Sequence, residues 1–182
     1  MTAIIRPSEP RDLPELTAIY RHAVLNGTAS FEIDPPDEAE MARRRDALLG
    51  AGFPYLVAEE DGRIFGYAYA GPYRPRPAYR YTVEDSIYVA PDLQGRGVGR
   101  ALLSALIEEC ERLGFRQMIG VIGDSSSTGS IALHRSLGFL NAGVVRDVGY
   151  KHGRWLDQVI MQRRLGSGTD GVPGVERSAE TA

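Results

Sequence analysis

A glycine-rich turn, Gln94-Gly95-Arg96-Gly97-Val98-Gly99, stands at the centre of this sequence. A β-branched segment, 86–89, precedes it, and apolar residues recur at helical spacing through 100–113, so a strand, a turn and a helix are predicted in this order. Glycine lacks a Cβ and tolerates positive φ, so the N–H groups of the turn can converge on one point. The positive end of the helix dipole faces that point and favours a phosphate there, and Arg100 adds further positive charge.

Two familiar phosphate-binding motifs do not fit this turn. The dinucleotide fingerprint needs G-x-G-x-x-G, whereas the spacing here is G-x-G-x-G, and a P-loop needs a Lys followed by Ser or Thr. An ordinary strand-to-helix turn is the structural alternative. The position of the turn between a strand and an amphipathic helix favours a binding loop.

The composition suits one folded domain. With 182 residues, 43% of them apolar, the chain can bury one substantial core. We expect a single domain over residues 1–165 and a disordered tail over 166–182, which is rich in Gly, Ser, Thr and charge. The net charge of −3 predicts no nucleic-acid partner.

Neither a membrane span nor a targeting segment is visible, because no apolar run approaches the roughly twenty residues that a bilayer requires. The single cysteine, Cys110, cannot form an internal disulfide and is expected in the core. A cytoplasmic protein is therefore expected.

Capping and turn signals predict the other elements. Asp12 and Glu15 have capping-box spacing before a helix that ends at Gly27, and Asp37 and Glu40 repeat this spacing before a second helix that ends near Gly50. Asp61-Gly62 predicts a hairpin between strands 55–60 and 63–70. Further strands are expected at 3–6, 81–89, 117–122, 139–148 and 155–164, with a helix over 130–137 capped by Ser127 or Thr128.

Besides the glycine turn, two groups of residues are candidates for chemistry. Glu84 and Asp85 interrupt a β-favouring run and point to opposite faces of the strand, so one of them can face a site; two charges at a frayed strand edge are the alternative. The loop 71–80 carries Arg74, Arg76, Tyr79 and Arg80. It is either a solvated connection or a rigid clamp for a substrate carboxylate, which guanidinium groups suit.

The whole body, from about residue 4 to residue 165, resembles the GCN5-related N-acetyltransferases, and within them the phosphinothricin/methionine sulfoximine acetyltransferase group. The glycine turn resembles the superfamily's pyrophosphate loop. The other matching blocks are Ala68-Tyr69-Ala70-Gly71-Pro72, Thr82-Val83-Glu84, Tyr88-Val89, Leu133-His134, Leu137-Gly138-Phe139 and Gly149-Tyr150-Lys151-His152-Gly153-Arg154-Trp155. The resemblance implies a mixed α/β fold of the GNAT type, in which a strongly bent, mostly antiparallel sheet is flanked by about four helices. It also implies that the sheet splays open between the strand ending at Val89 and the strand from Gln117.

The same resemblance implies acetyl-CoA as co-substrate, no metal, and transfer of the acetyl group to the amine of a small amino-acid-like substrate. It places the cofactor on Ile87, Tyr88, Val89, Gln94, Gly95, Arg96, Gly97, Val98, Gly99, Arg100 and Ser127. The group commonly has asparagine where this chain has Ser127, so that contact is expected to be weaker. A homodimer is also implied, and Tyr150 and Lys151 are candidates to close the pocket across its interface; for Tyr150, packing on the sheet is the alternative.

Chemical needs assign the catalytic roles within this resemblance. An ammonium substrate must lose a proton before it attacks the thioester, and Glu84 corresponds to the group's proposed base. The N–H of Val89 is a candidate oxyanion donor. His134 is the candidate acid for the thiolate, the alternative being a core histidine.

Substrate recognition is assigned to Phe31, Arg74, Arg76, Tyr79, Arg80 and Tyr150. Phe31 is either a substrate wall or a core plug. Two other functions remain open, a non-catalytic acetyl-CoA sensor and an acetyltransferase for a peptide N-terminus, a ribosomal protein or a polyamine. The arginine loop argues against a polycationic substrate, because like charges repel. The exact amine is not determined by the sequence.

Overall fold

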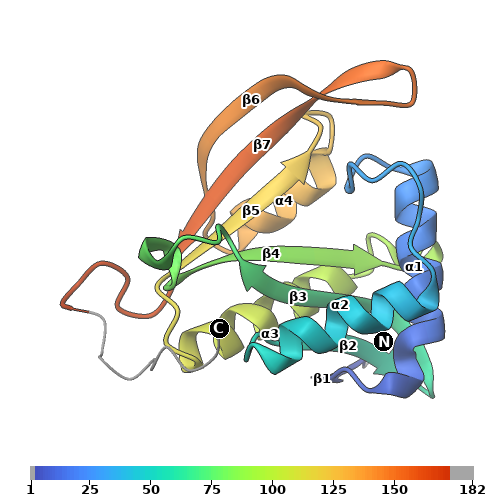
Figure 1. The fold of residues 1–182 in the computed structure, drawn as a ribbon, viewed down its shortest axis with the longest axis horizontal. Helices are drawn as coiled ribbons and strands as arrows, with labels where there is room; N and C mark the ends of the chain where they lie inside the picture. Colours follow the sequence, from blue (N-terminus) through green and yellow to red (C-terminus); the bar gives the residue numbers. More distant parts are fainter. Residues whose placement is uncertain (1–2, 173–182) are drawn as a thin grey trace.

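The computed structural model describes residues 3–172, which form one sheet with helices on both faces (Figure 1). Within this part of the chain, four α-helices and seven strands follow the order predicted from the sequence. The helices are α1 (Leu13–Asn26), α2 (Glu38–Gly50), α3 (Val98–Arg112) and α4 (Thr128–Ser136). The strands are β1 (Ile4–Pro7), β2 (Tyr55–Glu60), β3 (Arg63–Pro72), β4 (Thr82–Val89), β5 (Gln117–Gly123), β6 (Leu140–Lys151) and β7 (Arg154–Arg164).

The strand order is β1-β2-β3-β4-β5-β7-β6. Every neighbouring pair is antiparallel except β4 and β5, which run parallel. This confirms the expected mixed α/β architecture. The β2–β3 hairpin turns at Asp61 and Gly62, whose φ angles of 51° and 80° suit the tight turn that their sequence predicts.

The central pair of strands forms a fork. β4 and β5 are paired only from Thr82↔Gln117 to Asp85↔Gly120. Beyond this point β4 continues along β3, while β5 continues along β7 towards the projecting β6–β7 hairpin (Figure 1). The strands therefore diverge in the middle of the sheet, as the resemblance implies.

The core lies mainly between the β1–β4 half of the sheet and the helices. The α3 side chains Leu102, Leu103 and Leu106 are fully buried and belong to the cluster that also holds the sheet residues Val57 and Ala68. The predicted apolar face of α3 is confirmed, and burial of these leucines stabilises the fold by about 1.5–3 kcal/mol each. In Figure 1, α1 and α2 lie on one face of the sheet and α3 and α4 on the other.

The predicted helix caps are partly wrong. Asp12 precedes α1 but caps nothing there, because its carboxylate accepts hydrogen bonds from Arg6 and from the Glu9 N–H. Glu15 accepts instead from the Ile64 N–H in β3 at 2.8 Å. Asp37 does cap α2, accepting from the Glu40 N–H at 2.8 Å. The local spacing predicted the helix starts correctly, but the side chains of Asp12 and Glu15 bind partners outside the helix instead of capping it.

Two further boundaries differ from the sequence expectation. α3 begins at Val98, inside the glycine turn, rather than at residue 100. Ser127 stands at the start of α4, yet its hydroxyl donates backwards to the Gly123 carbonyl at 2.7 Å instead of capping the helix. Residues 166–172 of the predicted tail contain only turns and bends, and 173–182 lie outside the described residues.

The β6–β7 hairpin carries apolar side chains on its surface: Leu140, Val144, Val145, Val148, Tyr150 and Trp155 are all exposed. Cys110, in contrast, is fully buried on α3, as expected. Among residues 3–172, no helix is both long and apolar enough to pass through a membrane.

Candidate active site

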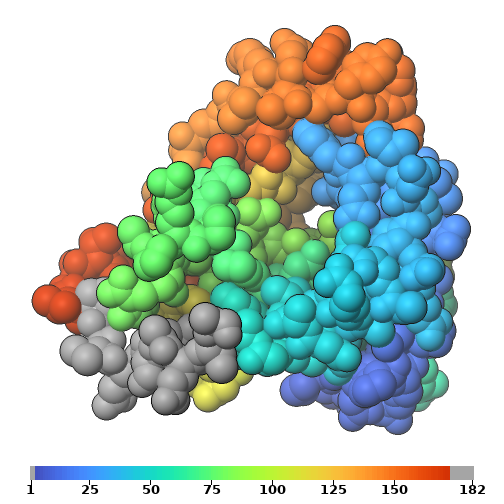
Figure 2. Space-filling model, in the orientation of Figure 1, coloured from blue at the N-terminus to red at the C-terminus, as the bar shows by residue number. Residues whose placement is uncertain are grey.

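A pocket of about 240 Å³ lies at the fork between β4 and β5. Its walls come from the segment after α1 (Ala29–Phe31), from β4 (Glu84–Tyr88), from the end of β5 (Val121–Gly123), and from Ser127, Ser130, His134 and Gln158. Figure 2 shows a hollow near the middle of the molecule, bordered by blue, green and orange atoms of these regions. The splay of the sheet thus creates a cavity into which a carboxylate from β4 is placed.

Glu84 is the carboxylate that suits a base. Burial raises its pKa above the usual value, the neighbouring charge of Asp85 raises it further, and Arg74 opposes both effects. Asp85, on the opposite face of β4, is buried and contacts His134 instead. The two side chains thus have different partners, although both Glu84 and Asp85 line the pocket.

The register of β3 and β4 directs two backbone N–H groups into the gap. The Ala90 N–H donates to the Phe65 carbonyl at 2.9 Å, so the adjacent pair Gly66↔Val89 is a non-hydrogen-bonded pair. By alternation the Ile87 and Val89 N–H groups also point away from β3, towards the side that β5 has left. A developing oxyanion in the gap would find donors there.

A second hollow, of about 380 Å³, continues from the first. The two share Ala29, Ile87, Tyr88 and Ser127 as lining residues, and the second extends to Val89, Gln94 and the α1 residues His22 and Asn26. The two hollows therefore adjoin along β4, and one reaches Gln94 of the glycine turn while the other reaches Glu84. His22 and Asn26 were not predicted as site residues, because nothing in the helical pattern of α1 distinguishes this face from a solvated one.

The glycine turn is built to hold an anion. Gly95 and Gly97 have φ angles of 74° and 87°, and a Cβ on either would meet no atom within 4 Å, so the space before them is open. The first hydrogen bond of α3 joins the Ala101 N–H to the Gly97 carbonyl at 3.0 Å. The N–H groups of the first helical residues thus have no partner within the helix. These features fit the pyrophosphate of a coenzyme.

The sequence profile of the acetyltransferase (GNAT) family matches residues 16–139. The chain belongs to this family. It is 55% identical over 169 residues to a phosphinothricin N-acetyltransferase of Alcaligenes faecalis, covering 93% of this chain and 86% of that protein. It is 44% identical over 166 residues to an L-methionine sulfoximine/L-methionine sulfone acetyltransferase of Pseudomonas paraeruginosa, covering 91% and 96%.

Solved structures agree with this assignment. The crystal structure of a GNAT superfamily phosphinothricin acetyltransferase from Sinorhizobium meliloti, in complex with AcCoA, matches this fold with a TM-score of 0.95. The two sequences are 51% identical, and the match covers 100% of this chain and 98% of that one. The chain is thus an acetyltransferase by family, as its sequence blocks predicted.

His134, a candidate from the sequence, lines the pocket of this acetyltransferase but is almost fully buried. Its Nε2 lies 3.0 Å from Asp85 Oδ2, and its Nδ1 lies 2.8 Å from the Ser130 carbonyl oxygen. Both ring nitrogens therefore have protein partners. Asp85 was not predicted as this partner, since the strand pattern gives its face but not what packs on it.

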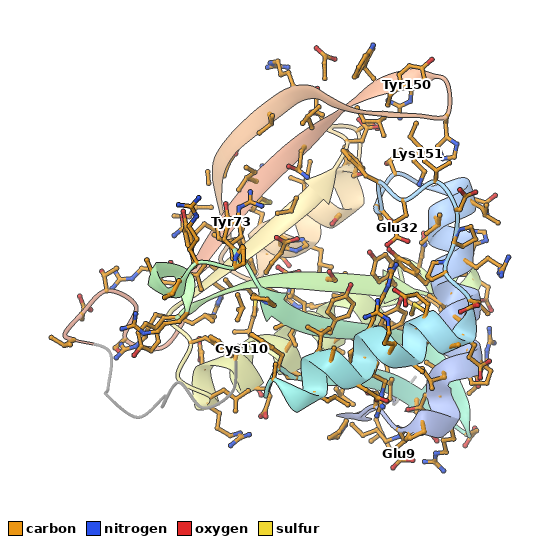
Figure 3. All side chains as sticks on the ribbon, viewed as in Figure 1. Glu9, Glu32, Tyr73, Cys110, Tyr150 and Lys151 are labelled. Atoms are coloured by element: carbon orange, nitrogen blue, oxygen red, sulfur yellow. The ribbon has the colours of Figure 1, made fainter. Side chains whose placement is uncertain are left out.

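Most residues of the arginine loop lie outside the pocket. Arg74, Arg76, Tyr79 and Arg80 are exposed and are absent from its walls. Arg74 stacks on Tyr73 at 4.9 Å, and Arg80 on Tyr81 at 4.6 Å. Tyr73 lies across the molecule from Glu32 and Lys151 (Figure 3). The structure thus brings Glu84 and Phe31 together at the fork but leaves this loop at its rim.

Phe31 belongs to the pocket wall and is also packed as a plug. Its ring is seated between two glycines, because a Cβ at Gly149 would lie 2.4 Å from Cε2 of the ring and one at Gly123 would lie 2.9 Å from Cε1. The neighbouring Ser30 carbonyl accepts a hydrogen bond from the buried Lys151 at 2.7 Å. The segment after α1 is thereby fastened to both β5 and the β6–β7 hairpin.

Tyr150 and Lys151 occupy adjacent positions but point differently. Lys151 reaches from the hairpin towards the segment that holds Glu32, whereas Tyr150 lies at the far end of the hairpin (Figure 3). Tyr150 is 59% exposed and packs edge-on against Trp155 at 5.3 Å. Within one chain it therefore lies away from the pocket.

Proposed function

We propose that this protein transfers the acetyl group of acetyl-CoA to the amino group of a small amino acid of the phosphinothricin or methionine sulfoximine type. The names of the similar proteins support the amino-acid substrate, and the AcCoA complex of one of them supports acetyl-CoA as the donor. The observation that carries it is the placement of a half-buried Glu84 in a pocket that adjoins the hollow reaching Gln94 of the glycine turn. Because acetyl-CoA is a metabolite of the cell interior, we also propose a cytoplasmic location.

The coenzyme would lie along the two adjoining hollows, from the glycine turn to the fork. Its pyrophosphate would accept hydrogen bonds from the turn, with Gly95 and Gly97 leaving room and Arg96 and Arg100 nearby. Arg100 is held in place by its hydrogen bond to the Ser136 hydroxyl at 2.6 Å. The Ser127 hydroxyl donates its hydrogen bond to the Gly123 carbonyl. Towards the coenzyme it would therefore act only as an acceptor or through a bridging water.

Glu84 would act as the base, directly or through a water. The ammonium group of the substrate gives Glu84 one proton, and the freed amine nitrogen forms a bond to the thioester carbonyl carbon. The oxyanion that forms is stabilised by the N–H of Val89, with that of Ile87 beside it. The C–S bond then breaks with its electron pair on sulfur. The nitrogen loses its second proton to solvent, the thiolate takes up a proton from solvent, and Glu84 returns its proton to solvent before the next turnover.

The arginine loop would hold the carboxylate of the amino acid. Arg74 is the best-placed residue, because its charge already acts on Glu84, and Arg76, Tyr79 and Arg80 share its short loop. Phe31 would bound the side chain of the substrate from the opposite wall. A bidentate guanidinium–carboxylate pair would favour an amino acid over a simple amine.

We also propose a homodimer that uses the exposed apolar surface of the β6–β7 hairpin. Val144, Val145, Val148, Tyr150 and Trp155 are between 40% and 61% exposed. Such a surface is typical of an interface. Tyr150 would then be covered by the second copy.

Thiol release from acetyl-CoA tests the reaction. The amine panel would contain phosphinothricin, methionine sulfoximine, methionine sulfone, common amino acids, spermidine and short peptides. Saturable turnover with the first three is expected, with Glu84→Gln lowering kcat by about 10²–10⁴-fold while acetyl-CoA binding, measured by calorimetry, is unchanged. Glu109→Gln, in an exposed ion pair on α3, is the matched control. Binding of acetyl-CoA without turnover of any amine would refute the enzyme and favour a sensor.

A further inference from the structure

A buried contact between Asp85 and His134 lies at the apex of the fork. Asp85 and Gly120 are the last paired residues of β4 and β5, and the Asp85 carboxylate contacts His134 of α4 at this point. The side chains of Asp85 and His134 are only 2% and 4% exposed. Three elements therefore meet where the parallel strands begin to separate.

The hydrogen bonds of His134 determine its protonation state. The Ser130 carbonyl can only accept, so Nδ1 must carry a proton. Although burial disfavours the charged ring, the hydrogen bond and charge of Asp85, together with the Ser130 carbonyl, raise the pKa of His134 above its usual value. The ionised carboxylate of Asp85 can likewise only accept, so Nε2 also donates, and a ring that donates from both nitrogens is an imidazolium.

The ring has little freedom to leave this position. A Cβ at Gly120 would lie 2.8 Å from its Cδ2 and 3.3 Å from Asp85 Oδ1, so only glycine leaves space on β5. Phe139 packs edge-on against its other side at 4.9 Å. Donating a proton to a thiolate would require the ring to break one of its two hydrogen bonds inside this enclosure.

We propose that Asp85 is a positioning residue that holds His134 as a fixed imidazolium. The pair fixes the geometry of the fork and the net charge next to Glu84. His134 does not deliver a proton to the leaving thiolate. The inference rests on the proposed function in so far as Glu84 is the base. It gives Asp85 a role and replaces the acid role considered for His134.

The charge balance follows from the groups around Glu84. Those that act on it electrostatically are Asp85 on β4, Arg74 on the arginine loop and Tyr69 on β3. Its backbone partners Gly71 and Ile119 carry no charge. The His134 imidazolium neutralises Asp85. Loss of His134 would leave a buried carboxylate next to Glu84, and this would make Glu84 harder to ionise.

The kinetic test compares three variants by their profiles of kcat/KM against pH. In His134→Gln the acidic limb is expected to move up by about one pH unit, because Asp85 is left uncompensated. In Asp85→Asn and in the double variant Asp85→Asn/His134→Gln the limb should lie at or below that of the wild type. Rescue of His134→Gln by the second substitution is the expected signature. A double variant as impaired as His134→Gln, or a loss confined to the alkaline limb, would overturn the inference in favour of a general acid.

Nitrogen NMR of the imidazole rings tests the charge state without any turnover. The sequence has three histidines, so the signals of His134 can be assigned by their loss in His134→Gln. At pH 7.5 both of its nitrogens should be protonated in the wild type, and one should be unprotonated in Asp85→Asn. A neutral His134 in the wild type would refute the proposal. If no amine is acetylated, the proposed function fails while this measurement still decides the state of the pair.

Discussion

The packing of the Phe31 ring against Gly149 predicts how substitutions at these two positions change stability. Gly149 in β6 is not in the left-handed region, so Gly149→Ala introduces no backbone strain, but its new methyl group would lie 2.4 Å and 2.6 Å from two ring carbons of Phe31. Because ordinary contacts begin near 3.4 Å, the ring must move by about 1 Å. Overpacking of this kind costs about 1–3 kcal/mol.

We expect Gly149→Ala to lower the free energy of unfolding by about 2 kcal/mol, measured by urea denaturation, and to lower Tm by about 4–8 °C. Phe31→Ala should also destabilise the protein, because the ring loses its packing. In the double variant the methyl group occupies space that the ring has left. Its cost should therefore fall below the sum of the two single costs by at least about 1 kcal/mol.

Gly50→Ala is the matched control. Gly50 ends α2, and a Cβ there meets no atom within 4 Å, so this change should be neutral or slightly stabilising. Additive costs of Gly149→Ala and Phe31→Ala would show that the ring does not sit in the glycine slot. The same variants should raise KM for the amino acid, since Phe31 also lines the pocket.

Three other perturbations test separate parts of the structure. Gly97→Ala places a side chain at φ 87°, so we expect a loss of about 1 kcal/mol of stability and a raised KM for acetyl-CoA, with little change in kcat. Because the pKa of His134 is raised in the folded state, its ion pair with Asp85 stabilises the protein fully below pH 6.5 and less as pH rises through the folded pKa. The urea midpoints of the wild type and Asp85→Asn should therefore converge at alkaline pH. Val148→Glu should shift the proposed dimer to monomer in light scattering, and an unchanged mass would contradict an interface at this position.

Where the sequence succeeded, local chemistry was sufficient. The turn at Asp61-Gly62 and the glycine turn before α3 need positive φ, which few residues accept, so these positions could be read from residue type alone. The alternation of side chains along β4 likewise separated Glu84 from Asp85. Such features depend on neighbours within a few residues.

The sequence was insufficient or wrong where a side chain binds a partner outside its own helix or strand. Asp12 and Glu15 have the spacing of a capping box, yet they bind Arg6 and the Ile64 N–H, because bonds to a charged group and to a strand end compete with the helix terminus. The ambiguity over Phe31 had the same origin, since its slot is made by Gly123 and Gly149, far along the chain.

The sequence by itself determined the order of the elements, the glycine turn at 94–99 and the alternation of side chains along β4, because these follow from backbone geometry and side-chain period. Tertiary structure alone decided that β4 and β5 part after Asp85↔Gly120, and that the walls of the fork come from α1, α4 and β7. It also decided that His134 is held by Asp85. The physical reason is that burial and hydrogen-bond partners across 49 residues depend on how the sheet folds as a whole.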